Sequence, residues 1–358
     1  MGGPAVTSDP LRITRRTAAA LWAAFLGIAL AAIIALIPLP YAVLRPGPAT
    51  NTLGKGSDGK PLVTVVGAPT YPTTGALDFT TVSVSGGPGR RVNAWDLLGA
   101  YLSSSAEIYR EDQLFAPGTT SEQVKERNAA EMTSSQEEAT AVALRSIGKT
   151  VTTRYAIASV AEGTPAAAVL KPDDIVLAVD GTTIASLADI QRLVRAHTSG
   201  QEVRLTIRRA GKDQDVSART TTVEGVTALG VRMQPVYDYP FEVTIDAGDV
   251  GGPSAGTMFA LAVRDILTPG AMTGGKKIAG TGTIDDAGEV GPIGGIRQKI
   301  VGAKEAGATY FLAPADNCRD LAGEQIEGIT VVRIATFDDA VHAVDEIAAG
   351  GSDLPRCG

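Results

Sequence analysis

An uninterrupted apolar segment near the amino terminus constrains this chain more than any other feature. Residues 17–37 (TAAALWAAFLGIALAAIIALI) contain no charged side chain. At about 1.5 Å per residue, a helix of this length extends roughly 30 Å, which is the thickness of a bilayer's hydrocarbon core. The segment has no polar face, which argues against a buried helix in a soluble domain. The sequence therefore predicts a transmembrane helix over residues 17–37.

The charges on either side of this segment predict its orientation. Three arginines lie between residues 12 and 16, whereas residues 38–53 contain only Arg45. Under the positive-inside rule, the amino terminus is cytoplasmic and the rest of the chain is extracytoplasmic. A cleaved signal peptide is the alternative, but the apolar stretch is too long and no convincing A-x-A site follows. We therefore expect a retained single-pass anchor in the cell membrane.

Charge and cysteine content narrow the functional class. The net charge of −7 and the absence of like-charge blocks argue against a nucleic-acid-binding protein. Cys318 and Cys357 would face an oxidising compartment, so we expect a disulfide that ties the carboxy-terminal tail to the last domain. Two free thiols are the alternative. With only two histidines, the cysteines do not form a metal site, and we expect no metal and no cofactor.

The remainder of the chain divides by pattern into several segments. Residues 38–61 are rich in proline and glycine, which predicts an extended, exposed linker. Strand and helix patterns follow. Residues 93–109 place Trp95, Leu98 and Leu102 at helical spacing, and residues 134–147 predict an amphipathic helix with Ser134 as its cap. The predicted parts are 1–16 as a cytoplasmic amino terminus, 17–37 as the transmembrane helix, 38–61 as the linker, 62–150 and 223–346 as two parts of one domain, 151–222 as a separate module, and 347–358 as a tail.

The module at residues 151–222 carries the run GTPAAAVLKPDDIVLAVDG, followed by a helix beginning near Leu187. This pattern resembles a PDZ domain. The resemblance implies a groove between the strand at Tyr155–Val160 and the helix at Leu187–His197, where peptides would add a strand to the sheet edge. The alternative is that the apolar side chains of that helix merely fill the core.

Residues 251–256 (GGPSAG) form a glycine-rich turn before a helix predicted over residues 254–267. The plain interpretation of Ser254 is a helix cap, since serine is a preferred N-cap residue. A catalytic interpretation has its own physical basis. Glycines let a substrate approach the backbone closely, and free N–H groups at a helix start can stabilise an oxyanion. This motif alone leaves both interpretations open.

A nucleophilic serine requires a base, and histidine is scarce here. His197 falls in the PDZ-like helix and His342 in the terminal helix, and neither occupies a catalytic-looking loop. A Ser–His–Asp triad is therefore not expected. Lys299 lies on a helix predicted over residues 296–305, beside apolar residues, where burial would lower its pKa toward neutrality and let it accept the serine proton. A solvated surface lysine is the alternative.

Four motifs occur in order within residues 241–315: GPSAG at 252–256, TG at 281–282, PIGG at 292–295, and Lys299. Together they resemble the proteolytic domain of the Lon family. The resemblance implies that Ser254 is the nucleophile, that Lys299 is the base and that the Thr281 hydroxyl helps to hold the lysine. We assign the oxyanion and substrate-backbone contacts to the same turn, at Gly251, Gly252, Pro253 and Ala255.

The whole arrangement is similar to membrane-anchored, PDZ-containing Lon-like proteases of bacteria. The segments GALDFTTVSV and TSSQEEATAVAL also resemble that subfamily. This likeness implies a Lon-type proteolytic domain of the α/β (α+β) class that includes residues 62–150. It also implies an inserted PDZ domain and one amino-terminal transmembrane helix. It also implies a homo-oligomer, as a hexamer.

Two features depart from the Lon pattern. Lon carries an aspartate three residues before the serine, whereas this chain has Gly251 there and Asp249 as the nearest acid, which leaves open whether a carboxylate supports Lys299. No ATPase module is present, because the GKT at residues 148–150 lacks the preceding glycine of a P-loop and follows a helix. The acidic residues Asp285, Asp286 and Glu289 are interpreted as a solvated hairpin turn.

The leading hypothesis is an ATP-independent serine endopeptidase acting on unfolded or membrane-proximal extracytoplasmic proteins. Its PDZ module would bind or position polypeptide ends, and no nucleic acid or ATP would take part. The alternative is a non-catalytic, membrane-anchored PDZ scaffold in which Ser254 and Lys299 are incidental.

Overall fold

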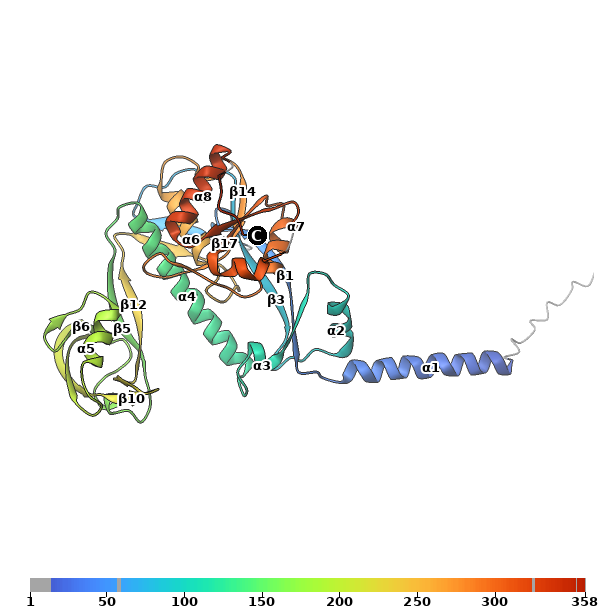
Figure 1. Cartoon of the computed structure of the whole chain (residues 1–358), viewed down its shortest axis with the longest axis horizontal. Helices are drawn as coiled ribbons and strands as arrows, with labels where there is room; N and C mark the ends of the chain where they lie inside the picture. Colours follow the sequence, from blue (N-terminus) through green and yellow to red (C-terminus); the bar gives the residue numbers. More distant parts are fainter. Residues whose placement is uncertain (1–13, 57–58, 324–325, 352, 358) are drawn as a thin grey trace, which may run out of the picture.

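The computed structural model describes residues 14–56, 59–323, 326–351 and 353–357. One long helix, α1 (Arg15–Leu36), extends away from the folded body (Figure 1). This helix is long and apolar enough to cross a membrane, and none of its residues is buried against the chain. It fits a single-pass anchor over the predicted range. Arg12 and the rest of residues 1–13 of the predicted cytoplasmic terminus lie outside the described residues.

The main body is built on a six-stranded mixed sheet with the strand order β18-β17-β14-β3-β1-β4. Strands from the two parts predicted at 62–150 and 223–346 meet at its centre, where β3 and β14 pair in parallel. The pairing supports one domain made from both segments. The strands are β1 (Tyr41–Asn51), β3 (Ala76–Gly86), β4 (Glu107–Arg110), β14 (Lys277–Gly280), β17 (Tyr310–Pro314) and β18 (Thr330–Ile334).

Strand β1 corrects the prediction of an exposed linker over residues 38–61. Its residues 42–44 are buried, and the strand lies between β3 and β4. The prolines and glycine that indicated a linker lie at a register shift between Pro46 and Ala49, beyond the part of β1 that pairs with β4. Proline is compatible with a strand at such an irregularity, because one backbone N–H there needs no ladder partner.

Helices cover both faces of the sheet. On one face, α6 packs against β3, α4 and α8, and buried apolar side chains from these elements form the largest described core. On the other face, α7 packs across β1 and β3, where Gly302 lies so close to β1 that an added Cβ would sit 2.6 Å from the Gly47 carbonyl oxygen. The helices are α4 (Ser121–Ser146), α6 (Gly256–Leu267), α7 (Ile296–Glu305) and α8 (Phe337–Ala349).

The shorter elements complete this body. Strand β13 pairs with β2, and β15 with β16 in a hairpin, while α2 and α3 lie close to β4. Their bounds are β2 (Val63–Val66), α2 (Ala94–Tyr101), α3 (Glu111–Leu114), β13 (Glu242–Ile245), β15 (Thr283–Ile284), β16 (Val290–Gly291) and the 3-10 helix η2 (Ala315–Leu321).

The PDZ-like module forms a second sheet with the strand order β12-β5-β6-β8-β9, and it is connected to the main body through α4 and β13 (Figure 1). This sheet extends to Asp238, beyond residue 222 where the sequence placed its end. Its elements are β5 (Thr152–Val160), η1 (Pro165–Ala168), β6 (Ile175–Val179), β7 (Thr182–Thr183), α5 (Leu187–Arg195), β8 (Glu202–Arg209), β9 (Lys212–Arg219), β10 (Thr221–Val223), β11 (Val226–Ala228) and β12 (Val231–Asp238).

The strand order also corrects the predicted position of the peptide groove. β5 pairs with β12 along its whole length and with β6 on its other side, so it has no free edge to which a peptide could add. The strand at this edge of the sheet is β12. A cavity of about 380 Å³ lies between it and α5, lined by Ile190 and Val194 of α5 and by Leu229, Val231 and Met233. Strand order depends on pairing between distant segments, which local pattern does not reveal.

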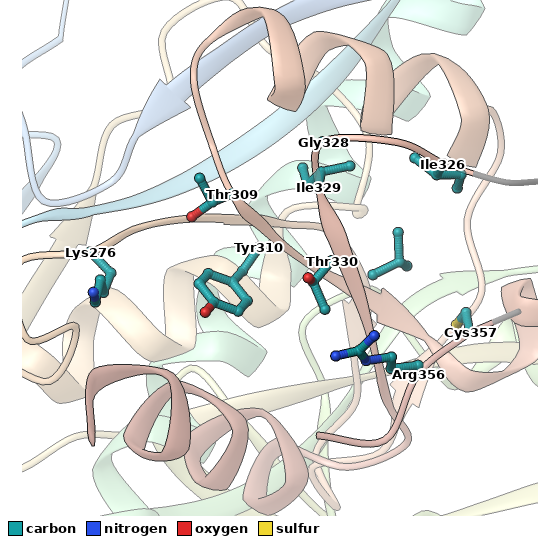
Figure 2. Close-up of a pocket in the computed structure, with 10 residues that line it drawn as sticks. Lys276, Thr309, Tyr310, Ile326, Gly328, Ile329, Thr330, Arg356 and Cys357 are labelled. Carbon is teal, nitrogen blue, oxygen red and sulfur yellow. The ribbon is translucent and has the colours of Figure 1, made fainter. Parts of the chain in front are cut away.

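The carboxy-terminal tail packs on the outermost strand of the main sheet. Arg333 N–H donates to the Pro355 carbonyl, and Cys357 N–H donates to the Val331 carbonyl, so the tail covers the edge of β18. Cys318 and Cys357 form a disulfide, as expected from the sequence. Figure 2 shows Arg356 and Cys357 beside Thr330 of β18.

Candidate active site

Ser254 lies in the turn that enters α6. The helix begins at Gly256, two residues later than predicted, and its N-cap is Ala255. Ser254 is therefore not the cap, and its hydroxyl is free for another partner. The Oγ atom lies 2.8 Å from Nζ of Lys299. Ser254 is half-buried, which keeps it accessible from the solvent side.

Helix α4 holds this turn in place. The Ser135 hydroxyl donates to the Pro253 carbonyl at 2.9 Å, and the Gly252 N–H donates to the Asn128 carbonyl at 2.9 Å. The start of α6 is equally close, because a Cβ at Gly256 would sit 2.7 Å from the Ser135 hydroxyl oxygen. Glycine at 256 is thus required by the close packing of α4 against the turn.

Lys299 reaches the turn from α7 on the other side of the sheet. Its side chain is only 2% exposed. Burial lowers the pKa of this amine to about 7, because a charged ammonium is poorly solvated in the protein interior. A large fraction of the amine is therefore neutral near physiological pH.

The hydrogen bonds around Nζ determine where a neutral amine directs its lone pair. Nζ lies 2.7 Å from the Thr80 carbonyl oxygen and 3.1 Å from the Thr281 hydroxyl oxygen. The Thr281 hydroxyl donates its own proton to the Ser254 carbonyl at 2.8 Å, so it can only accept from the lysine. Both N–H groups of the neutral amine are then used, and the lone pair faces Ser254 Oγ.

Burial alone accounts for the lowered pKa of Lys299. Among the residues that the structure describes, no carboxylate forms an ion pair with it. Asp249, the nearest acid in sequence to the serine, is exposed and lines the mouth of the cleft. A nearby carboxylate would raise the pKa of the amine, so its absence among these residues favours the neutral base.

The predicted oxyanion and substrate contacts divide into two groups. Pro253 has no N–H, and the Gly252 N–H is already bonded to the Asn128 carbonyl. Within the described part of the chain, no acceptor contacts the N–H groups of Gly251 and Ala255. Ala255 is the N-cap of α6, where the helix dipole favours negative charge.

The dyad opens into a cleft of about 580 Å³. Most of the side chains around it are apolar, and they include Leu44, Phe79, Val82, Val84, Leu114, Phe115, Met132 and Val250. A larger cavity of about 720 Å³ lies elsewhere, beside Lys276, Thr309 and Thr330 (Figure 2). These residues lie at the amino ends of β14, β17 and β18, whereas Thr281 follows the carboxyl end of β14. That cavity is therefore separate from the dyad.

Three residues that support the site were not identified from the sequence: Thr80, Asn128 and Ser135. Two of them act through backbone carbonyls, which any residue type supplies. Thr80 and Ser135 fall in segments whose likeness to a protease subfamily was noted, but that likeness assigned them no role. These contacts become apparent only in the folded chain, where β3 and α4 lie beside the turn.

The remaining sequence candidates do not line the cleft. His197 contacts Asp180 inside the PDZ-like module, and His342 lies on α8. The acidic turn joins β15 and β16, with Asp286 paired to Arg145 at 2.8 Å. No group of three or more potential metal ligands occurs among the described residues.

Two family models match the chain. A PDZ domain model matches residues 126–220, and a model of the Lon protease (S16) C-terminal proteolytic domain matches residues 228–346. The structure places the boundaries differently, since α4 packs in the main body and β12 pairs in the PDZ sheet. A solved PDZ domain of the SdrC-like protein from Listeria monocytogenes is 21% identical, covers 22% of this chain and 85% of that chain, and has a TM-score of 0.22.

Several curated relatives are Lon proteases. Lon protease 1 of Bacillus subtilis (strain 168) is 37% identical over 112 residues, which are 30% of this chain and 14% of that protein. Lon protease of Clostridium beijerinckii is 38% identical over 136 residues, or 37% of this chain and 16% of that protein. The chain thus spans only a small part of the length of these relatives.

Proposed function

We propose that this chain, which carries a PDZ domain and a Lon-type proteolytic domain of the serine peptidase class, is a membrane-anchored endopeptidase with a Ser254–Lys299 dyad. The observation that carries the proposal is the 2.8 Å contact between Lys299 Nζ and Ser254 Oγ, with the other two amine contacts directing the lone pair at the serine. A buried lysine with this geometry has no evident structural purpose, because burying an amine costs stability.

The mechanism follows from these contacts. Lys299 accepts the proton of Ser254 as Oγ attacks the substrate carbonyl carbon, and the Ala255 N–H donates to the developing oxyanion. The lysine then gives the proton to the leaving amine nitrogen, which leaves an acyl ester on Ser254. Water, deprotonated by the same amine, attacks the ester carbonyl; the ester C–O bond breaks, the second product is released, and the lysine returns the proton to Ser254 Oγ. Thr281 keeps both partners aligned throughout.

Substrates of this site are polypeptides in an extended or unfolded state. The cleft is lined mainly by apolar side chains, which are complementary to residues that a folded protein buries. In the PDZ domain, the edge of β12 and the apolar wall of α5 together support binding of a peptide end by strand addition. The PDZ domain then selects or positions chains for the dyad.

The location and energy requirement belong to the same proposal. α1 anchors the chain, and the arginines before it support a cytoplasmic amino terminus and an extracytoplasmic protease. Independence from ATP is part of the same proposal, because the GKT at residues 148–150 lacks the preceding glycine of a P-loop and follows a helix. A hexamer stays an expectation drawn from the resemblance to Lon.

Full-length protein in detergent micelles, incubated with an unfolded polypeptide, tests the proposal. Wild type should cleave with and without ATP, whereas Ser254→Ala and Lys299→Met should be inactive. Lys304→Met is the matched control, since Lys304 lies on the same helix but is exposed. Its activity should equal that of wild type.

Cleavage that persists in both dyad variants would disprove the mechanism. Failure of the wild type to cleave any unfolded substrate, together with retained binding of peptide ends, would favour the non-catalytic PDZ scaffold.

A further inference from the structure

Helix α2 is apolar on more than one side. It comprises Ala94–Tyr101 (AWDLLGAY), and its one charged residue, Asp96, accepts from the Asn93 N–H in a capping box. Its inner side packs on the main body through Ala100 and Leu97, next to Val43. A short surface helix needs only this one apolar side, and the opposite side is normally polar.

The outer side of α2 is apolar as well. Trp95 and Leu98 are 47% and 45% exposed, and Tyr101 and Leu102 are 80% and 75% exposed. These four side chains recur at intervals of three or four residues, so they lie together on the helix surface. A cluster of this size on a folded domain indicates a surface that is covered in the working molecule.

This outer side is continuous with the anchor. The Trp95 indole N–H donates to the Ala31 carbonyl of α1 at 3.1 Å. Ala31 lies five residues before Leu36, the last residue of α1, which places the contact about 7–8 Å inside the end of the helix. Figure 1 shows α2 beside that end of α1, while the PDZ domain lies at the far side of the molecule.

We propose that α2 is a second membrane contact, with Trp95, Leu98, Tyr101 and Leu102 inserted into the interfacial layer of the bilayer that α1 crosses. Tryptophan and tyrosine favour this layer, where the ring is apolar and its polar atom reaches the headgroups. The exposed residues Arg90 and Arg91 lie a few residues before the helix, where their guanidinium groups would be available to lipid phosphates. The proposal rests on α1 as a membrane span and not on protease activity.

With both α1 and α2 in contact with the membrane, the main body is held in one orientation. With α1 alone, it could rotate relative to the membrane surface. The cleft and the PDZ groove then lie at defined heights above the lipid. Substrates would be drawn from chains close to the membrane surface.

Tryptophan fluorescence of the full-length chain in phosphatidylcholine vesicles tests this contact. The chain contains two tryptophans, so Trp22→Phe leaves Trp95 as the sole tryptophan. We expect Trp95 to be quenched by lipids brominated near the headgroup more than by lipids brominated near the chain ends, and to be shielded from aqueous iodide. In Trp95→Phe, lipids brominated deep in the chains should quench Trp22, which reports insertion of α1.

Variants separate specific contact from simple proximity. In the Trp22→Phe background, Leu98→Ser with Leu102→Ser should reduce lipid quenching of Trp95 several-fold and increase iodide quenching. Val223→Ser with Val226→Ser removes a comparable exposed apolar pair from the PDZ domain and should change neither.

Three outcomes would overturn the proposal. Iodide quenching of Trp95 without lipid quenching, while Trp22 is inserted, would place α2 in water. Shielding from both quenchers would mean that a protein surface covers α2. If lipids do not quench Trp22, α1 does not span the bilayer and the second contact fails with it.

Discussion

The hydroxyl of Thr281 donates to the backbone carbonyl of Ser254, and this bond helps to orient the amine of Lys299. Because its only proton is committed to that carbonyl, the Thr281 oxygen can act only as an acceptor toward Lys299. Together with the Thr80 carbonyl, it occupies both N–H groups of the neutral amine. The lone pair is left facing the serine hydroxyl. These two hydrogen bonds therefore set the orientation of the amine toward Ser254.

Replacing Thr281 tests this arrangement. Thr281→Val should lower kcat by about 10–100-fold with little change in KM, because it misdirects the base without altering the cleft. Thr281→Ser restores the hydroxyl and should recover most of the activity. The measurement is steady-state kinetics on a fluorogenic peptide.

Thr273→Val is the matched control. Thr273 is also fully buried in the same domain, but its hydroxyl donates to the Thr74 carbonyl, away from the dyad. If both valine variants lower kcat equally, the effect is a general loss of structure and not a loss of lysine orientation.

The pH dependence of cleavage should report the lysine. The pKa of Lys299 is lowered to about 7 by burial, and only the neutral amine can accept the serine proton. Activity should therefore be low in acid and rise with pH, with one midpoint near 7 in kcat/KM. Rates measured across the neutral range with the full-length protein would show this limb.

Glu138 provides the control, because burial and nearby acids raise its pKa to about 7 as well. It lies on α4, beside the acidic turn and outside the cleft. Glu138→Gln should leave the midpoint unchanged. A midpoint that disappears in this variant would identify the glutamate, and not Lys299, as the group that titrates.

Local features predicted from the sequence agreed with the structure where the signal was itself local. Helix α7 was predicted over residues 296–305, which are its observed bounds, since glycines mark both its ends. The start of α4 was missed, because its first half is polar and begins at a capping box of Thr120 and Gln123 instead of Ser134. The first helical turns of α4 are polar and exposed, so they show no apolar periodicity from which a helix could be predicted.

Features that depend on distant pairing could not be predicted in this way. The proline-rich β1 became an interior strand of the sheet only through its register with β3 and β4. In the site, the order and spacing of the four sequence motifs were enough to identify Ser254 and Lys299. The Thr80 carbonyl that holds the amine is a backbone group, so it has no sequence signature.

The corrected PDZ groove makes a separate prediction. Met233→Asp, on the edge strand β12, should weaken binding of a peptide with an apolar carboxy-terminal residue by about 10–100-fold, as expected for losing the burial of one large apolar side chain. Gln234→Asp places the same charge on the next residue, which is exposed and does not line the groove. Its affinity should match wild type in fluorescence anisotropy. Equal affinities for all three proteins would place the peptide elsewhere.

The buried amine should also destabilise the protein in a pH-dependent way. The pKa of Lys299 is about 7 in the folded chain against an ordinary value of 10.5. Between these values the unfolded chain binds more protons, so the unfolding free energy of the wild type rises with pH across this window and is lowest below 7.

Lys299→Met removes this titration, which allows a direct comparison. Between about pH 9 and about pH 6, the wild type should lose roughly 2–3 kcal/mol of stability relative to the variant. Urea unfolding followed by circular dichroism in one detergent gives both curves, and Lys304→Met should track the wild type because its side chain is exposed. If the wild-type and Lys299→Met curves run parallel with pH, the amine titrates alike in both states, and burial does not hold it neutral.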